Sequence, residues 1–432
     1  MTRLSQAMSN TDNESTYTTP VTMGEKKPPS SAKAFTSNFT DASIAAERVA
    51  FIKILFGGCL GMVLVIFGIF SIYWGALWKV PDHPLPGWVI DLDGGAVGSA
   101  VSQGLLQSSA QSKVAWELKT GLGPSEVPVL VLEQKTWVAI VINAGASNNL
   151  ENAGSNYNST SAITLYAVEA RNENAYRSII RPVAEGTLNT VYNNFARQRV
   201  SAMSADALGS LASSSPQAIS KPIAHTIDNL APFNVPVASA ITFVGLIYLL
   251  ILSFFIVMIG SSAREISGLE RKLTTRSLIL VRISSVIIAY FFISLFYSLL
   301  SLAFQVDFSR KFGSSGFLVF WMINFTGMLS VGLALESMMT LLTSRFVPFF
   351  MIIWIITNVS VCFMPIEVLP HFFRYGYAMP FYNVSGAVRT IIFGTKNQVG
   401  MHFGILIAWA CVSLISLPVF QWWRQRGLRR TN

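Results

Sequence analysis

Apolar residues gather into six segments that are each long enough to cross a bilayer, and these segments are unevenly spaced. A helix needs about 20 apolar residues to span a hydrocarbon core roughly 30 Å thick. The predicted spans are residues 52–74, 236–260, 279–304, 317–343, 346–365 and 402–422. A long, mostly polar stretch separates the first span from the other five. The pattern predicts a polytopic α-helical membrane protein with six transmembrane helices.

The polar stretch, residues 79–235, alternates between the two-residue period of strands and the 3.6-residue period of helices. Short β-branched or aromatic runs bounded by Gly, Pro or Asn predict strands. These runs cover residues 88–92, 127–132, 137–143 and 162–168. Helical periodicity predicts helices over residues 97–110 and 172–207, the second broken near Pro182. We therefore expect an extracytosolic α+β domain between the first two spans.

Three further segments have their own composition. Residues 1–45 are rich in Ser, Thr and Asn and predict a disordered tail, because they contain too few large apolar side chains to form a core. Residues 264–277 carry apolar positions on one helical face and predict an amphipathic cytosolic helix at the membrane surface. Residues 366–400 are too apolar for an open loop and predict a re-entrant-like outer loop with short helices at 369–377 and 384–393.

Composition and charge fit a membrane protein. Hydrophobic residues make up 52% of the chain and charged residues 12%, about half the charge that is usual for soluble domains. The net charge is +9, yet residues 79–235 carry 10 basic against 12 acidic side chains. The basic excess lies beside the spans and in the tail at 423–432, which argues against a nucleic-acid partner. The positive-inside rule places both termini in the cytosol; an odd number of spans would move one of them across the membrane.

The sequence shows no motif for nucleotide hydrolysis, hydrolytic catalysis or metal binding. The patterns GxxxxGK[ST], GxSxG and HExxH are absent, as is GxGxxG after a strand. The three cysteines lie inside predicted spans and the four histidines are isolated. We therefore expect no cofactor, no metal and no enzymatic activity. Asp91 and Asp93 leave one alternative open, because they could form an acid–base pair or simply belong to a turn.

Glu336 is the one acidic residue well inside a predicted span, which makes it a functional candidate. It could bind a proton or a cationic substrate. It could also make a structural hydrogen bond or face a wet vestibule, because helical rise places it about two turns from the cytosolic end. Asn324 and Asn358 are further polar candidates within spans, with contacts between helices as the alternative.

Two of the six Asn-x-Ser/Thr sequons lie outside both the cytosol and the spans in this topology. Asn158, in a Gly- and Ser-rich loop, is the main candidate for a glycan, and Asn383, expected at the lipid surface, is the second. Gly57 and Gly61 in the first span would allow close contact between helices. This contact could form a homodimer or lie within one chain.

Five strings of sequence flank the predicted spans in a specific order. They are SIYWGALWKV (71–80), WVIDLDGGAVG (88–98), WVAIVINAGAS (137–147), YAVEARNENAY (166–176) and RYGYAMPFYNVSGAVRTIIFGTK (374–396). Together they resemble the fungal nitrosoguanidine-resistance protein family, whose shared region is a domain of unknown function related to ABC-2-type membrane domains. The resemblance runs from about Val49 to Trp423.

The resemblance implies a fungal membrane protein tied to drug or mutagen resistance and to the lipid organisation of the plasma membrane. In ABC-2-type exporters a cytosolic helix at the position of residues 264–277 couples to an ATPase subunit. Arg264, Glu265, Glu270 and Arg271 are therefore candidates for contact with a separate ATPase or transporter subunit. We expect export of toxic small molecules or lipid-linked translocation. The alternative is a non-transporting organiser that regulates a transporter or phospholipid asymmetry.

Overall fold

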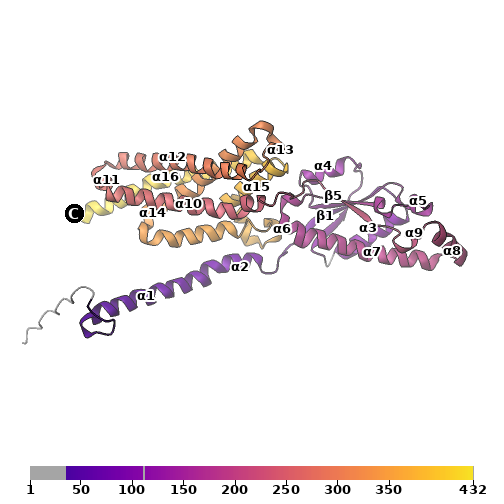
Figure 1. The fold of residues 1–432 in the computed structure, drawn as a ribbon, viewed down its shortest axis with the longest axis horizontal. Coiled ribbons are helices and arrows are strands. Elements are labelled where there is room, and N and C mark those ends of the chain that lie inside the picture. Colours follow the sequence, from indigo (N-terminus) through magenta and orange to yellow (C-terminus); the bar gives the residue numbers. More distant parts are fainter. Residues whose placement is uncertain (1–35, 110–111, 432) are drawn as a thin grey trace, which may run out of the picture. The chain divides into compact units, whose positions relative to one another are not determined.

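The structure, a computed structural model, describes residues 36–109 and 112–431, and the chain divides into two compact units (Figure 1). The first unit is Met1–Val65, and its described part contains the 3-10 turn η1 (Ala42–Ile44) and helix α1 (Ala45–Val65). The tail that we expect to be disordered falls mainly on residues 1–35, outside the described residues. The second unit is Ile66–Asn432 and contains a sheet and a bundle of long helices.

The sheet has five strands in the order β2-β1-β3-β4-β5, and only β3 and β4 pair antiparallel. The strands are β1 (Leu85–Asp91), β2 (Val114–Leu118), β3 (Val138–Ile142), β4 (Ile163–Ala167) and β5 (His225–Asn229). The helices before and within this region are α2 (Ser71–Leu77), α3 (Ala96–Ser108), α4 (Glu126–Leu132), α5 (Ala146–Glu151), α6 (Glu173–Ala175), α7 (Arg181–Ala202), α8 (Ala205–Ser214) and α9 (Gln217–Ser220).

Alternate residues of the central strands face opposite sides of the sheet, as strand geometry requires. Val89 and Ile140 belong to a buried cluster that also contains residues of α3, α5 and α7. Ile90 and Val141 belong to a second cluster with Val127 and Val131 of α4. The sheet is therefore covered by helices on both faces.

Three of the four predicted strands are confirmed, as β1, β3 and β4. The strand predicted at residues 127–132 is wrong, because this segment is helix α4. Val127 and Val131, one helical turn apart, are buried while Val129 is 59% exposed, so the burial follows a helical period. The sequence prediction also missed β2 and β5, which are the two edge strands.

The helix predicted at 97–110 corresponds to α3, and the one predicted at 172–207 to a run from α6 through the π-helical turn η6 (Tyr176–Ile180) into α7. Pro182 does not break this run, so that detail of the prediction is wrong. The residue lies at the start of α7, directly after the π turn, where the helical hydrogen-bond pattern is already altered.

Five helices are long and apolar enough to cross a membrane, by length and composition, within the described residues. They are Ala42–Leu77, Ala240–Ile266, Thr275–Ala303, Ser309–Leu342 and Val399–Arg426. The remaining predicted span, residues 346–365, corresponds to a shorter apolar helix, Phe346–Val359. The count of six membrane crossings therefore stays a prediction. The helices of the bundle are α10 (Gly245–Ile266, preceded by the π turn η7, Ala240–Val244), α11 (Leu269–Lys272), α12 (Thr275–Ala303), α13 (Ser309–Phe312), α14 (Gly316–Val359), α15 (Pro380–Phe393) and α16 (Val399–Thr431).

Both halves of α14 contact the same helix, α15, although helical structure is assigned along the whole length of α14. Gly327, in the first half, lies against Val384 of α15. Asn358, near the end, accepts a hydrogen bond from the backbone N–H of Phe381, also in α15. A straight helix would separate Gly327 from Asn358 by about 45 Å. The chain therefore reverses direction within α14, as the two predicted spans at 317–343 and 346–365 require.

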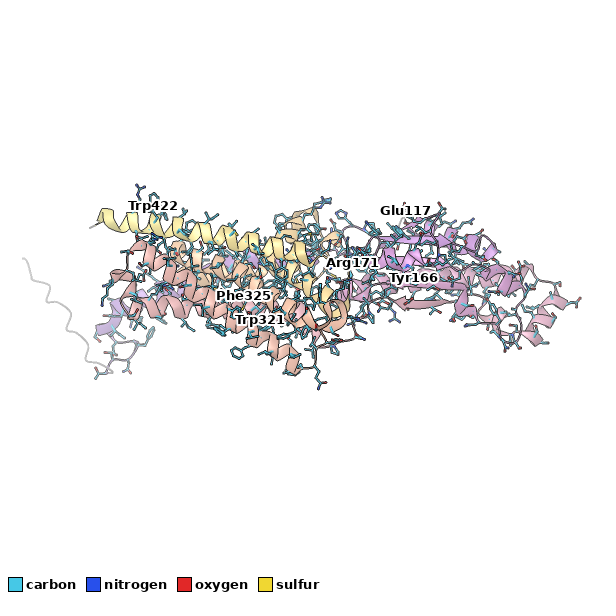
Figure 2. The ribbon with its side chains drawn as sticks, turned by 90° about the horizontal axis from the view of Figure 1, so that it is seen from above. Glu117, Tyr166, Arg171, Trp321, Phe325 and Trp422 are labelled. Carbon is cyan, nitrogen blue, oxygen red and sulfur yellow. The ribbon has the colours of Figure 1, made fainter. Side chains whose placement is uncertain are left out.

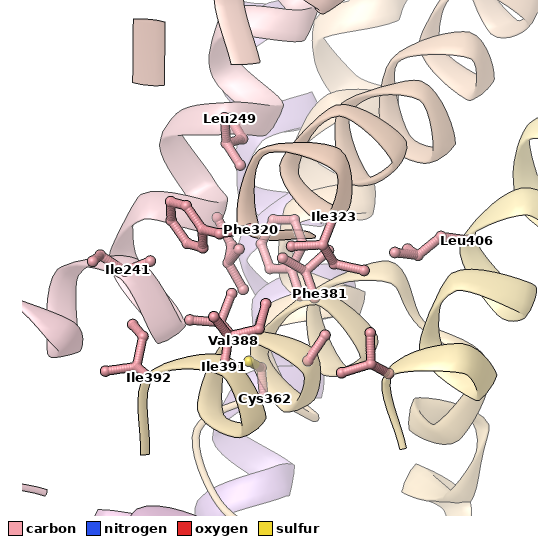
Figure 3. Close-up of a cluster of buried hydrophobic side chains, with 14 of the residues drawn as sticks. Ile241, Leu249, Phe320, Ile323, Cys362, Phe381, Val388, Ile391, Ile392 and Leu406 are labelled. Carbon is pink, nitrogen blue, oxygen red and sulfur yellow. The ribbon is translucent and has the colours of Figure 1, made fainter. Parts of the chain in front are cut away.

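The segment at residues 366–400, predicted to be an outer loop, packs its last helix into the bundle. It contains two 3-10 turns, η9 (Ile366–Val368) and η10 (His371–Ala378), followed by α15. Only two residues of α15, Tyr382 and Gly386, are not fully buried. Figure 3 shows Phe381, Val388 and Ile391 of α15 beside Phe320 and Ile323 of α14. The backbone of α15 is thus covered by protein, whereas η10 keeps exposed residues such as Phe372 and Arg374.

Candidate functional site

A cluster of charged side chains is buried at the end of the bundle opposite the sheet. Glu336 of α14 is fully buried, and its Oε1 accepts hydrogen bonds from Nη2 of Arg264 at 3.0 Å and from Nε of Arg282 at 2.6 Å. Arg282 also donates to the carbonyl oxygen of Glu336 at 2.9 Å and to Oε1 of Gln421 at 2.7 Å. The cluster thereby joins α10, α12, α14 and α16.

The charges of this cluster do not balance. Two guanidinium groups share one carboxylate, which leaves one positive charge in excess. Oε2 of Glu336 is buried and has no hydrogen-bond partner among residues 36–109 and 112–431. A buried oxygen without a partner is costly, so this atom is a place where a proton, a water molecule or a cationic group could bind. The cluster can therefore hold the four helices together and can also respond to an added charge.

The sequence identified Glu336 but not its full set of partners. The sequence indicates a different role for Arg264, as a contact for another subunit, and Arg282 is not among its candidate site residues. The available signal was its position inside the predicted span at 279–304, where an arginine needs a partner. Which face of α12 it occupies depends on packing, so Glu336 could not be identified as that partner from the sequence.

The structure places Asn324 and Asn358 in contacts between segments. Nδ2 of Asn324 donates to Oγ of Ser298 on α12 at 3.1 Å. Asn358 donates to the carbonyl of Trp354 at 2.8 Å and accepts from the N–H of Phe381 at 3.1 Å. These contacts agree with the alternative that both residues hold helices together.

The four candidate coupling residues are not equivalent. The single amphipathic helix predicted at 264–277 is wrong, because α10 ends at Ile266, α11 is one turn long and α12 begins at Thr275. Arg264 is buried against Glu336. It is therefore not accessible to the separate subunit that we expected it to contact. Glu265 and Arg271 are exposed, and Glu270 lies 3.5 Å from Arg424. A contact with another subunit would fall on this exposed connection.

A second buried ion pair joins the sheet region to the bundle. Nη1 of Arg389 on α15 lies 2.5 Å from Oε2 of Glu173 and 3.1 Å from the carbonyl oxygen of Ala170. Burial by itself raises the pKa of Glu173, but the neighbouring Arg389 charge and its hydrogen bond outweigh burial and lower that pKa below its ordinary value. Glu173 is therefore ionised at neutral pH, and the pair fixes α15 to the turn that follows β4.

A third ion pair lies beside the second. Arg171 donates to Oε1 of Glu367 at 3.2 Å and to the carbonyl of Thr136 at 3.1 Å. Its guanidinium carbon lies 3.6 Å from the centre of the Trp137 ring, a cation–π contact. Burial lowers the pKa of Arg171, while Glu367 opposes this shift. Figure 2 labels Arg171 where the sheet region meets the helices.

Asp91 and Asp93 are occupied by a turn. Asp91 accepts hydrogen bonds from the N–H groups of Asp93 and Gly94. Asp93 accepts from the backbone and the hydroxyl of Ser147, as well as from Gly95 and Gly98. These bonds lower the pKa of Asp93 although burial alone would raise it. The arrangement is that of the turn alternative.

The two glycan candidates lie in opposite environments. Asn158 is exposed and caps the 3-10 turn η4 (Ser159–Ala162). Asn383 is fully buried, donates to the carbonyls of Tyr377 and Met379, and bonds His402 through Oδ1 at 2.9 Å. The expectation of Asn383 at the lipid surface is wrong, because the amide serves to hold α15 against α16.

Glycosidase treatment should therefore reveal one glycan. After expression in a eukaryotic host, Asn158→Gln is expected to abolish the gel shift on deglycosylation, because Asn158 is exposed and lies in the domain that the sequence predicts to be extracytosolic. Asn383→Gln is the matched control, since the same sequon is removed from a buried site. A shift that survives Asn158→Gln would contradict this assignment.

Residues 59–415 match the profile of a family described as "Protein of unknown function (DUF3533)", which covers most of the chain. The chain belongs to the DUF3533 family. This DUF3533 protein is 26% identical over 450 residues to "Uncharacterized endoplasmic reticulum membrane protein YJR015W" of Saccharomyces cerevisiae, across 93% of this chain and 85% of that protein. No solved structure matches the chain significantly.

The DUF3533 protein is a multi-pass integral membrane protein, since the family match and the five long apolar helices agree. The matched region contains the Glu336 cluster without Gln421, which lies beyond residue 415, and the ion pairs of Arg389 and Arg171. Neither comparison bears on mutagen resistance or on ABC-2-type domains, so these stay predictions.

Proposed function

We propose that this DUF3533 protein is the membrane part of a system that exports toxic lipophilic molecules or translocates lipid-linked ones. The observation that carries the proposal is the charge cluster at Glu336. Ionisable side chains among membrane helices are costly and are usually kept for function. This cluster has excess positive charge and one carboxylate oxygen that has no partner in the described part of the chain. It also joins four helices that would have to separate or tilt for passage.

The energy for transport would come from another chain. The sequence holds no nucleotide-binding motif. In the ABC-2-like arrangement that the resemblance implies, an ATPase subunit would contact the connection between α10 and α12, where Glu265 and Arg271 are exposed. The protein itself would then have no enzymatic activity and no cofactor.

The membrane in which the protein works is part of the proposal. The resemblance implies the plasma membrane, whereas the yeast relative is named as an endoplasmic reticulum membrane protein. We favour the endoplasmic reticulum, with the sheet region in the lumen and both termini in the cytosol. This topology follows from the distribution of Lys and Arg beside the spans.

Transport into endoplasmic reticulum microsomes tests the proposal. Sealed microsomes from cells with and without the gene are given ATP and a labelled lipophilic alkylating compound, and accumulation of the compound in the lumen is followed over time. We expect faster accumulation with the gene, and accumulation at the basal rate for Glu265→Gln combined with Arg271→Gln, which leaves the buried cluster intact. Equal accumulation with and without the gene, at verified membrane expression, would contradict the proposal.

A non-transporting organiser is the second candidate, favoured by the absence of any energy-coupling motif. It would bind a transporter or alter lipid asymmetry. Purification in mild detergent discriminates between the two, because a stoichiometric transporter partner supports the organiser. Movement of substrate by the purified protein alone in liposomes supports transport. Dimerisation through Gly57 and Gly61 of α1 would suit either role, and cross-linking of the full chain would detect it.

A further inference from the structure

A polar cavity lies between the sheet region and the outer ends of the bundle helices. Its volume is about 80 Å³, enough for several water molecules or one small polar group. It is bounded by the turn after β4, the segment that follows α14, helix α15 and the first turn of α16. Its polar lining includes Arg171, Asn172, Ser385, Arg389, Thr395, Lys396, Gln398 and His402.

The cationic side chains of the cavity are not fully neutralised. Arg171 pairs with Glu367, and Arg389 pairs with Glu173. Lys396 also lines the cavity, is half-buried, and has no acidic partner within residues 36–109 and 112–431. Its backbone position is fixed, because Oγ1 of Thr390 donates to the carbonyl of Lys396 at 2.9 Å. The cavity therefore presents one uncompensated positive charge.

His402 gives the cavity a hydrogen-bond acceptor. Nδ2 of Asn383 donates to two carbonyls, so its Oδ1 faces Nδ1 of His402 and accepts a hydrogen bond from the Nδ1–H group. Neutral His402 then carries its lone pair on Nε2, for which the described residues provide no partner. The side chain is 4% exposed and lines the cavity. A ligand with a hydroxyl group would satisfy this atom.

We propose that this cavity binds a phosphate group, either the headgroup of an anionic phospholipid or a free phosphate. The Lys396 ammonium would supply the charge, and the hydroxyl groups of Ser385 and Thr395 would donate to phosphate oxygens. The protonated oxygen of a phosphate monoester would donate to Nε2 of His402. The cavity borders the start of α16, a membrane helix, so a headgroup can reach it from the outer leaflet. This binding does not depend on the proposed transport.

Binding to the full-length chain, purified in an uncharged maltoside detergent, tests the site. The probes are inorganic phosphate, dihexanoyl phosphatidic acid and, as the neutral comparison, dihexanoyl glycerol, each titrated calorimetrically. We expect phosphatidic acid to bind and the glycerol to show no binding. Equal affinity for inorganic phosphate would identify a free-phosphate site, and at least tenfold weaker phosphate binding would identify a lipid site. No binding of either phosphate probe would overturn the proposal.

Variants link the binding to the cavity. Lys396→Gln is expected to weaken phosphatidic acid binding at least tenfold, and Gln398→Glu, which adds a negative charge to the lining, to weaken it similarly. Lys311→Gln is the control, because it removes the same charge from an exposed position on α13. If either folded cavity variant binds as tightly as the parent, the site is not this cavity. Loss of microsomal transport with intact binding would count only against the transport proposal.

Discussion

Replacing Glu336 with glutamine is expected to destabilise the membrane bundle by about 3–5 kcal/mol, because the change leaves two buried arginines without their carboxylate. The measurement is the midpoint of thermal unfolding of the purified chain in detergent, followed by intrinsic tryptophan fluorescence. Because the cluster joins four helices, we also expect loss of folded protein in the membrane fraction.

Two further variants test the origin of this effect. Glu265→Gln removes the same charge from an exposed position on α10 and should shift the midpoint little. Arg282→Gln should lower the midpoint by an intermediate amount, because Glu336 would keep Arg264 as its partner. A Glu336→Gln protein as stable as Glu265→Gln would show that the cluster contributes nothing to stability.

Replacing Arg389 with methionine is expected to cost a similar amount, about 3–5 kcal/mol, because it leaves Glu173 buried and unpaired. The loss of stability should be largest where α15 contacts the turn after β4, because Arg389 also donates a hydrogen bond to the carbonyl of Ala170. Hydrogen exchange should therefore rise first in residues 169–180 and 380–393. Arg374→Met, at an exposed position on η10, is the control.

The pH dependence of this pair has a defined sign. The folded-state pKa of Glu173 lies below its ordinary value of 4.5, so the pair stabilises the fold fully above that value. Its contribution is lost as the pH falls through the depressed pKa. Adding Glu173→Gln to Arg389→Met should restore part of the lost stability, because no unpaired charge then remains. Identical stability of the single and double variants at pH 7 would contradict the assignment.

Most of the long apolar helices could be predicted from the sequence, because the length of an apolar run decides whether its helix can span the hydrocarbon core. The segment at 346–365 shows the limit of this reasoning, since its helix, Phe346–Val359, is shorter than the apolar run. The reversal inside α14 is signalled in the sequence by Arg345, the basic residue between the predicted spans at 317–343 and 346–365. The buried helix α15 was also expected from its apolar composition, within one or two turns of its true ends.

The direction in which polar side chains point could not be predicted. Arg264 and Asn383 both lie at positions that a topology rule assigns to a surface, yet both are buried against another helix. The rotation of each helix is decided by its neighbours, which the local sequence does not specify. The same holds for residues 127–132, whose Val and Leu side chains suit a strand or a buried helix equally well until the sheet is in place.

Thiol labelling tests most directly the central claim that the sheet region and the α10–α12 connection lie on opposite sides of one membrane. In a chain with Cys59, Cys362 and Cys411 replaced by alanine, single cysteines are introduced as Gly154→Cys and Lys272→Cys, both at exposed positions. Sealed endoplasmic reticulum microsomes are treated with a membrane-impermeant maleimide before and after permeabilisation. We predict that position 272 is labelled at once and position 154 only after permeabilisation. Immediate labelling at 154, with 272 protected, would contradict the account.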